Sequence, residues 1–274
     1  MPELIEVEII KRQLEQEIVT GSRITGSVYS ELRFSHIVSG LLLTPVVSYL
    51  KRRGKFLLVG LGLDADSPTQ ELIMHMGMTG KLQITAELPA ELPKHTHFHF
   101  SFTDPLNVTK HLLFIDARKL GRVKLTPKGT YTGLLKDLGP ELWEDAYPVS
   151  KVLKAFKSIK SILMDQQFIA GIGNYLADEI LFDAGIHPRR PGSSLTAEQV
   201  QSIITSAKKI SENVMKAGGL SFSDYVHLDG TKGSFRKHLK VYGRGGQNCY
   251  TCSTELSTIT LSGRTTIFCR GCQN

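Results

Sequence analysis

The spacing of apolar positions changes near residue 150 and divides the chain into two kinds of structure. Residues 3–18 carry apolar side chains three and four positions apart, which predicts an amphipathic helix. From about residue 23 to residue 127, the pattern shortens into β-branched and aromatic runs separated by Gly, Asp, Ser and Pro, which is typical of strands. These runs are LLTPVVSYL, KFLLVGLGL, ELIMHMGM, HFHFSF and HLLFIDA. The first half is therefore expected to be a β-sandwich or barrel with a leading helix.

Helical spacing returns in the second half, so the fold class is predicted to be α+β. Residues 128–150 are rich in Gly and Pro and are typical of a linker, whereas residues 150–184 and 196–217 have helical periodicity. Residues 218–248 are Gly-rich and basic, as in loops, and residues 249–274 hold all four cysteines. The helical segments and the cysteine segment are therefore expected to form a second structural region.

Composition restricts the class of protein. Hydrophobic residues make up 41% and charged residues 22% of the 274 residues, the balance of a globular protein. No apolar run is long enough to span a bilayer, and the acidic opening MPELIEVEII does not resemble a secretory signal, so a cytoplasmic location is expected. The net charge of +7 favours a polyanionic partner such as DNA, although many basic proteins bind no nucleic acid.

The cysteines follow the spacing C-x2-C-x16-C-x2-C through Cys249, Cys252, Cys269 and Cys272. In a cytosolic chain two C-x-x-C pairs favour one tetrahedral Zn²⁺ with no open position, hence a structural site; two disulfides or unpaired thiols are the alternative. Two β-like runs between the pairs predict a hairpin with Arg264 at its tip. A tip arginine is either solvated or in contact with a phosphate.

A tight turn is predicted between two helices, one ending near Ala170 and the next beginning after Gly171-Ile172-Gly173. Asn174 occupies the expected N-cap of the second helix. Glycines permit close approach of a backbone, and a helix start offers N–H groups to an anion, so this turn could clamp a phosphate. An ordinary turn with a capping Asn explains the same residues.

Pro2 follows the initiator methionine, whose removal would expose a secondary amine that titrates far below a lysine. Such an amine can attack a sugar carbon and form an iminium ion. The neighbouring Glu3 could transfer a proton to the sugar ring oxygen or the leaving group. A proline opening a helix, followed by acids in the first turn, is also a common structural arrangement.

Taken together, the motifs resemble the bacterial formamidopyrimidine-DNA glycosylases across essentially the whole chain. They are MPEL-x-EVE, RRGKF, HMGMTGKL, DARKLG, LGPE, LMDQ-x-x-x-AGIGN-x-x-ADEILF-x-AGIHP, GRGG and the cysteine spacing. The resemblance implies a β-sandwich, a helix-two-turn-helix region and a zinc finger. The implied domains are 1–130 (catalytic), 131–149 (linker), 150–245 (DNA-binding, with a lid loop) and 246–274 (zinc finger).

The resemblance also implies roles for individual residues. Pro2 matches the family's Schiff-base nucleophile, Glu3 the general acid–base and Glu6 an auxiliary carboxylate. Lys55 and Arg264 match the residues that approach the phosphate beside the lesion and assist the two strand cleavages. Contacts with the phosphate backbone of the DNA are implied for Asn174, His75, His95 and Tyr242. Met78 and Arg118 match the pair that fills the hole left by the flipped base, where an apolar wedge and a hydrogen-bonding arginine replace part of the lost stacking.

The implied activity is excision of oxidised purines, chiefly 8-oxoguanine and formamidopyrimidines, from double-stranded DNA, followed by β,δ-elimination at the abasic site. One structural zinc ion and a monomeric state are implied. The chain departs from the family pattern in Ile5, which replaces a proline, and in Leu120, which replaces a wedging phenylalanine and leaves the opposite-base preference open. Two alternatives stay open: an endonuclease VIII-like enzyme for oxidised pyrimidines, and a damage-binding protein without catalysis.

Overall fold

The structure is a computed structural model that describes residues 2–29, 40–130, 133–144, 147–221 and 226–274. The chain forms two compact units. Unit 1 comprises Met1–Lys136 with Gly218–Ser234, and unit 2 comprises Asp137–Ala217 with Phe235–Asn274. The predicted domain boundaries remain a proposal; they grouped Gly218–Ser234 with the helical region, whereas this segment is compact with unit 1. Met1 and residues 222–225 of the predicted lid lie outside the described residues.

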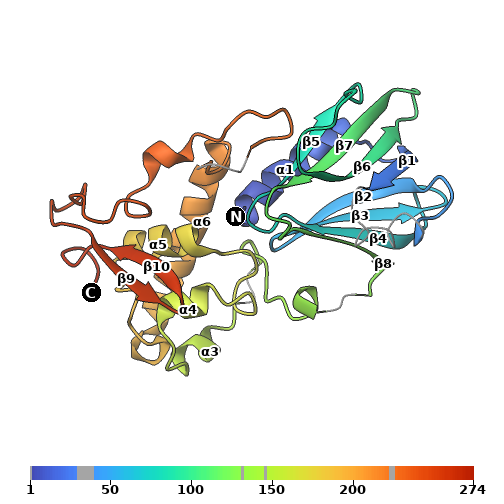
Figure 1. The fold of residues 1–274 in the computed structure, drawn as a ribbon. Coiled ribbons are helices and arrows are strands. Elements are labelled where there is room, and N and C mark those ends of the chain that lie inside the picture. Colours follow the sequence, from blue (N-terminus) through green and yellow to red (C-terminus); the bar gives the residue numbers. More distant parts are fainter. Residues whose placement is uncertain (1, 30–39, 131–132, 145–146, 222–225) are drawn as a thin grey trace. The chain divides into compact units, whose positions relative to one another are not determined.

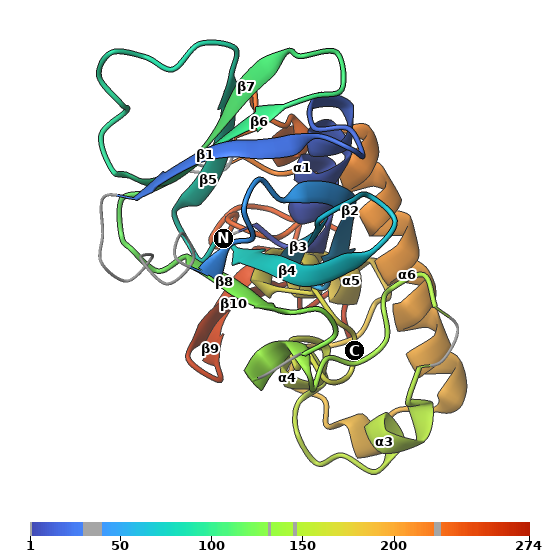
Figure 2. The same cartoon turned by 90° about the vertical axis from the view of Figure 1, so that its right-hand side faces the viewer.

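The described part of unit 1 contains the helix α1 and an antiparallel sheet, as the strand-like runs predicted. Its elements are α1 (Leu4–Glu17), β1 (Arg23–Tyr29), β2 (Val46–Arg53), β3 (Phe56–Gly62), β4 (Pro68–His75), β5 (Gly80–Thr85), β6 (Thr96–Thr103), β7 (Thr109–Asp116), β8 (Arg122–Pro127) and the 3-10 turn η2 (Gly133–Leu135). The strand order is β5-β7-β6-β1-β2-β3-β4-β8. A single residue pair, Arg23 with Val46, joins β1 to β2, and Figure 2 shows the two four-stranded halves as two layers.

The core of unit 1 lies between these two layers, so the predicted sandwich is confirmed. Phe98, Phe100 and Phe114 of one half share a single cluster of buried side chains with strand residues of the other half, such as Leu57 and Leu72. The inner face of α1 belongs to the same cluster through apolar residues at helical spacing, namely Val7, Ile10 and Leu14. Packing against both layers therefore fixes the helix that carries the N-terminal residues.

Unit 2 is mainly helical and ends in a two-stranded hairpin. Its elements are α3 (Val149–Leu153), α4 (Ile159–Leu163), α5 (Asn174–Asp183), η3 (Gly192–Ser194), α6 (Ala197–Lys216), η4 (Phe235–His238), β9 (Ser257–Leu261) and β10 (Arg264–Phe268). The predicted stripe of α6 is buried from Val200 to Val214, and a capping box of Thr196 with Gln199 starts this helix. Figure 1 shows β10 of the hairpin beside α5, with which it is in contact.

The helical periodicity of residues 150–184 does not correspond to one long helix. Three helices occupy that stretch, separated by non-helical connections at residues 154–158 and 164–173. Ser158 accepts a hydrogen bond from the Ser161 backbone N–H at 3.3 Å and caps α4, which ends at Leu163 and not near Ala170. In the part of the chain that the structure describes, no helix combines the length and apolarity needed to cross a membrane.

Candidate functional site

The start of α1 gathers the predicted nucleophile and both predicted carboxylates. Pro2 is buried and directly precedes Glu3, the N-cap residue of α1. The Glu3 backbone N–H donates to Glu6 Oε2 at 2.9 Å, half of a capping box. Glu3 is 4% exposed and Glu6 1% exposed. The structure therefore buries two carboxyl groups at the start of α1, one of them next to the N-terminal proline.

Glu6 also fastens a distant segment to this helix start. Its second oxygen, Oε1, accepts the backbone N–H of Leu220 at 2.9 Å. Further along the same segment, the Leu228 N–H donates to Gln13 Oε1 at 3.2 Å. The described residues on either side of 222–225 are thus tied to α1 at two points. Sequence analysis assigned Glu6 an auxiliary role but did not foresee that both of its oxygens accept backbone N–H groups.

A partly buried ion pair connects α1 to the hairpin that carries Lys55. Arg52 Nε lies 3.0 Å from Glu8 Oε2, and the Arg52 side chain is buried. Although burial favours the protonated form, Arg12, Arg52 and Lys11 hold the pKa of Glu8 below its usual value. Lys55 follows three residues after Arg52 in the tight turn between β2 and β3, where Gly54 has a φ of +55°. This ion pair therefore joins α1, which carries the N-terminal residues, to the β2–β3 hairpin, which carries Lys55.

His75 stands beside Lys55 and is held neutral. Burial, and then the positive charges of Lys55 and Arg122, lower the pKa of His75 to about 4. The Gly77 backbone N–H donates to His75 Nδ1 at 3.1 Å. In the neutral ring the proton must then reside on Nε2. His75 consequently offers an uncharged N–H donor in a positively charged neighbourhood, a suitable arrangement for an anionic oxygen.

Met78 and Arg118 come from two loops that are in contact. An Arg118 guanidinium nitrogen lies 3.6 Å from Met78 Sδ. Met78 is 43% exposed and Leu120, on the second loop, is 46% exposed. A Cβ on Gly77 would lie 2.6 Å from the Leu120 carbonyl carbon, so only glycine allows this close approach. The two loops thus present two apolar side chains and one arginine to solvent.

Asp116 holds these two loops together, and sequence reasoning missed its role. Its carboxylate accepts the Thr79 hydroxyl at 2.5 Å and the Gly121 backbone N–H at 2.6 Å. The Asp116 N–H donates to the carbonyl of His95, an exposed residue with a φ of +70°. The motifs HMGMTGKL and DARKLG carried the signal, because Thr79 and Asp116 lie within them. His95 is placed at the same scaffold by its backbone.

In unit 2, Asn174 is the first residue of α5 and not its N-cap. Gly173 occupies the N-cap position. Asn174 Nδ2 donates instead to the Thr265 carbonyl at 3.1 Å and so connects α5 to the hairpin. The preceding turn is held by Gln166, whose Oε1 accepts the Gly171 N–H at 2.9 Å and whose Nε2 donates to the Ile172 carbonyl at 2.8 Å. Gln166 is a second positioning residue that the sequence did not single out.

Arg264 is exposed at the first position of β10, paired with Leu261 across the Ser262–Gly263 turn. A buried ion pair beneath it fixes the strand. Lys160 Nζ lies 2.6 Å from Asp178 Oδ1 and donates to the Thr266 hydroxyl at 2.8 Å, while the Ile267 N–H donates to Asp178 Oδ2 at 3.1 Å. Burial raises the pKa of Asp178 to about 6, against the opposing effect of Lys160. The strand that carries the exposed Arg264 is thus held by buried polar groups.

Tyr242 is positioned through its backbone by Glu179 of α5. The carboxylate of Glu179 accepts the N–H groups of Lys240, Val241 and Tyr242 at 2.9, 2.9 and 2.8 Å. Burial raises the pKa of Glu179 even though these hydrogen bonds favour the charged form. The Tyr242 ring also meets Tyr175 edge to face, with ring centroids 6.1 Å apart. Glu179 is therefore part of the support for this candidate contact.

The four cysteines converge on one point at the end of unit 2. Their sulfur atoms all lie within 4.8 Å of one another. No disulfide joins them, since Cys252 and Cys269 are 3.3 Å apart and Cys249 and Cys272 are 3.9 Å apart at sulfur. Tetrahedral zinc with Zn–S bonds of about 2.3 Å places its sulfur ligands about 3.8 Å apart. The cluster has the size and donor set of such a site.

The structure thus assembles one group of predicted residues in each unit. Unit 1 contains Pro2, Glu3, Glu6, Lys55, His75, His95, Met78 and Arg118, and unit 2 contains Asn174, Tyr242, Arg264 and the cysteines. In unit 1 the scaffold joins the N-terminal helix, the β2–β3 turn and two loops. In unit 2 it joins α4, α5 and the hairpin.

Comparison with known proteins gave consistent matches over both units. Residues 1–123 match the formamidopyrimidine-DNA glycosylase N-terminal domain and residues 138–225 the H2TH domain of the same enzymes. The formamidopyrimidine-DNA glycosylase of Desulfitobacterium hafniense is 38% identical over 287 residues, and that of Listeria innocua 35% over 288, each covering 100% of both chains. Among solved structures, Lactococcus lactis Fpg in complex with DNA containing an abasic site is 32% identical, with a TM-score of 0.87 and 99% of each chain covered.

Proposed function

The chain belongs to the formamidopyrimidine-DNA glycosylase family, and from this premise we propose that it excises oxidised purines and nicks the resulting abasic strand. The observation that carries the proposal is the buried Pro2 directly before two desolvated carboxyl groups at the start of α1. Relatives solved with abasic-site DNA and with Fapy-dG DNA support the choice of substrate. The same comparisons support base excision repair as the setting.

We propose that the imino nitrogen of Pro2 attacks C1′ of the everted nucleotide after removal of Met1. The C1′–base bond breaks, its electron pair leaves with the base, and the base takes up the proton that the Pro2 nitrogen loses. Glu3 is the proton donor for the sugar ring oxygen as the ring opens, which leaves an iminium ion between Pro2 and C1′. Glu6 keeps the Pro2–Glu3 segment in place through the Glu3 N–H.

The iminium ion then permits removal of a proton from the opened sugar, with loss of the 3′ phosphate. Removal of a second sugar proton is followed by loss of the 5′ phosphate. Lys55, in its turn beside His75, and Arg264, on the hairpin, are the proposed groups on the phosphate next to the lesion. His75, His95, Asn174 and Tyr242 are the proposed contacts to neighbouring phosphates. The neutral Nε2–H of His75 donates to a phosphate oxygen at any pH above about 4, which makes this contact insensitive to pH in the physiological range.

Met78 and Arg118 are proposed to enter the space left by the everted base, and Leu120 to wedge beside the base opposite the lesion. Their loops are held by Asp116 before DNA arrives, so little side-chain and backbone ordering remains at binding. Leu120 supplies apolar volume but no aromatic face, and the preference for the opposite base is therefore expected to be less strict than with phenylalanine. The tether of Leu220 to Glu6 gives the proposed lid a fixed base.

We propose that the cysteines hold one structural Zn²⁺ and that the protein acts as a cytoplasmic monomer. Zinc, when bound, would cross-link the hairpin. Four thiolates would fill its coordination sphere, so no position would remain for a reacting water. Cys249, Cys252, Cys269 and Cys272 would hold it. The ion would thereby fix the strand on which Arg264 stands.

Substrate choice is tested by single-turnover excision from matched duplexes. We expect faster release of 8-oxoguanine opposite cytosine than of thymine glycol. The opposite order would favour an endonuclease VIII-like enzyme and contradict the assignment to oxidised purines. Catalysis is tested separately on a duplex with a preformed abasic site. Nicking there, with products carrying phosphate at both ends of the gap, is expected; binding without nicking would identify a damage-binding protein.

A further inference from the structure

Phe156 is 90% exposed, although a phenylalanine in that environment gains nothing from folding. It lies in the short connection between α3 and α4 of unit 2, and none of the residues assigned above to chemistry or phosphate contact lines the cavity beside it. Aromatic side chains left in water in this way are enriched where proteins meet other molecules. The surface around Phe156 is therefore a candidate contact surface.

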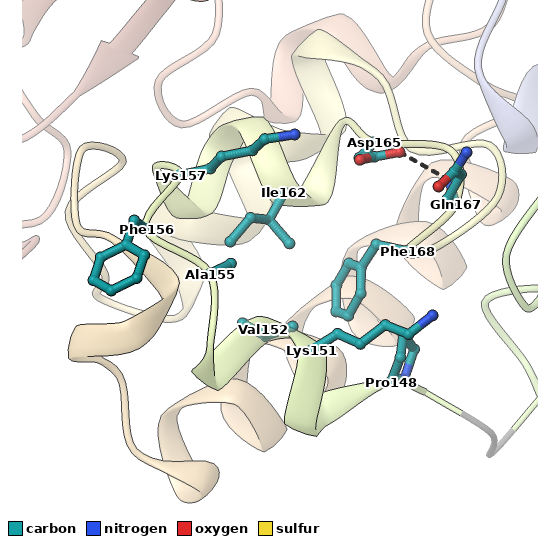
Figure 3. A pocket seen from close by; sticks show the side chains of 10 residues that line it. All are labelled: Pro148, Lys151, Val152, Ala155, Phe156, Lys157, Ile162, Asp165, Gln167 and Phe168. Carbon is teal, nitrogen blue, oxygen red and sulfur yellow. Dashed lines mark hydrogen bonds between the residues drawn. The ribbon is translucent and has the colours of Figure 1, made fainter.

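Beside Phe156 the surface opens into a cavity of about 310 Å³. Figure 3 shows Phe156 at one edge and the buried side chains of Val152, Ile162 and Phe168 lining the interior. This volume is at the lower end of the range of about 300–1,000 Å³ found for ligand pockets. The cavity is thus suited to one large apolar side chain and too small for a folded element.

The backbone that presents Phe156 is fixed on both sides. The Ala155 carbonyl accepts the Ser193 N–H at 2.8 Å, and the Lys157 carbonyl accepts the Gly192 N–H at 3.0 Å. A Cβ on Gly192 would lie 2.4 Å from the Val152 carbonyl oxygen, so the two segments are packed as closely as glycine allows. A fixed backbone lowers the ordering cost of binding. Phe156 is consequently a pre-positioned anchor and not part of a loose loop.

The rim of the cavity is mainly positive. Lys151 and Lys157 are exposed at opposite ends of the cavity in Figure 3, and Lys154 is exposed in the same connection. Asp165 is the one acidic residue among those lining the cavity, and its carboxylate accepts the Gln167 backbone N–H at 3.1 Å. Charge complementarity therefore favours a ligand with acidic groups on both sides of an apolar one.

We propose that this cavity, with Phe156 as its anchor, docks an acidic segment of another protein that inserts an aromatic side chain between flanking carboxylates. Inserted against Phe156 and Phe168, an aromatic ring would find edge or face contacts from both. Duplex DNA presents phosphates but no free apolar group for the cavity interior, so it fits the lysines and leaves the cavity empty. The proposal goes beyond the repair reaction and does not depend on it.

The test uses the full-length protein and a fluorescein-labelled, end-capped peptide Glu-Asp-Phe-Asp-Glu, with binding followed by fluorescence anisotropy. We expect saturable binding that weakens at least tenfold in Phe156→Ser and several-fold in Lys151→Gln. Matched controls are Leu106→Ser, which removes another strongly exposed apolar side chain, and Lys94→Gln, which removes a lysine in unit 1. Both should bind like wild type. Lys157 is left unchanged because it also lines the hollow beside Arg264.

A second peptide with Ser in place of its Phe should bind at least tenfold more weakly, as should one with Lys in place of its acids. Equal binding of all peptides or all variants would overturn the proposal, as would no binding at about 1 mM peptide, a concentration that detects even the weakest specific contacts. Duplex affinity of Phe156→Ser is measured in parallel. An equal loss of duplex affinity would assign the surface to DNA and also overturn it, whereas failure of excision in wild type would not.

Discussion

The two units prepare their candidate residues in different ways. At the start of α1 the candidate groups are themselves buried, and Glu3 and Glu6 are held by backbone N–H groups. On the hairpin, Arg264 is exposed and the buried groups, Lys160 and Asp178, lie beneath it. Burial thus acts on the candidate residues themselves in unit 1 and on the groups that support Arg264 in unit 2.

This difference follows from the tasks we propose for the two units. The proposed reacting groups at α1 need fixed positions shielded from water, and burial with backbone hydrogen bonds supplies both. A phosphate-binding guanidinium must be exposed to the phosphate and must stand on a fixed backbone. Buried groups beneath Arg264 fix its backbone and leave its side chain exposed. Variants in unit 2 should therefore disturb binding and folding together, whereas variants around α1 should affect chemistry with smaller losses of stability.

The largest expected effect comes from breaking the cysteine cluster. Structural zinc contributes about 10–16 kcal/mol in zinc-finger peptides, so Cys269→Ser or chelation should unfold the hairpin and abolish measurable DNA binding. Native mass spectrometry should find one metal ion per wild-type chain. Thr260→Ala, an exposed change on the same hairpin, serves as the control. Normal DNA binding by Cys269→Ser would contradict the structural role of the cluster.

Next in size is the loss of one partner of the buried ion pair. Asp178→Leu removes the carboxylate that pairs with the buried Lys160 and should cost about 3–5 kcal/mol in the free energy of unfolding of unit 2. The double variant Lys160→Met with Asp178→Leu should recover most of that loss. Asp183→Asn, which removes the partner of the exposed Lys209, should cost less than about 1 kcal/mol. Chemical denaturation measures all three, and equal losses in the single and double variants would refute the coupling.

A smaller effect is expected from pH through His75. Its pKa is lowered to about 4 in the folded protein from 6.5, so the folded state binds fewer protons between these values. The free energy of unfolding is therefore unaffected by His75 above pH 6.5. It decreases as the pH falls toward 4, by at most about 3 kcal/mol, because the unfolded state takes up the proton first. His75→Gln should flatten this part of the stability profile of unit 1. His238→Gln, on the surface of unit 2, should leave it unchanged; an equally steep profile in His75→Gln would disprove the assignment.

The smallest effect concerns the link between α1 and the Lys55 turn. Glu8→Gln should weaken the contact with Arg52 and cost about 1–2 kcal/mol in the stability of unit 1, because a hydrogen bond to a charged group is lost. The excision rate should fall while duplex affinity is retained. Glu15→Gln, whose partner Lys11 forms a more exposed pair, should cost less than about 0.5 kcal/mol. The link would be dispensable if both variants behaved alike.

Local patterns in the sequence predicted the parts of the molecule that local physics determines. The apolar stripe of α6, the leading helix and the cysteine spacing all act over a few residues or one turn. The break between α3 and α4 was not predicted, because a helical period continues across it while Ser158 interrupts the backbone. The turn before α5 was predicted from its glycines, but α4 ends at Leu163, well before the predicted end near Ala170.

Supporting residues were the hardest to predict. Lys160 meets Thr266 across 106 positions, Asp116 meets Thr79 across 37, and Glu179 meets Tyr242 across 63. Thr79 and Asp116 lie in motifs that the sequence showed, but the sequence does not pair them, and it gives no local sign of the other two pairs, since a buried charge is stable only where the fold brings its partner. The reacting residues were accessible through motifs, but the groups that hold them required the fold.

The central claim is that Pro2 becomes covalently joined to the sugar, and borohydride trapping followed by peptide mapping tests it most directly. Wild-type protein is incubated with an 8-oxoguanine duplex and reduced, and the cross-linked peptide is sequenced. The account predicts one adduct, on a peptide that begins at Pro2 and lacks Met1. An adduct on a lysine, or efficient nicking by protein that retains Met1, would contradict it.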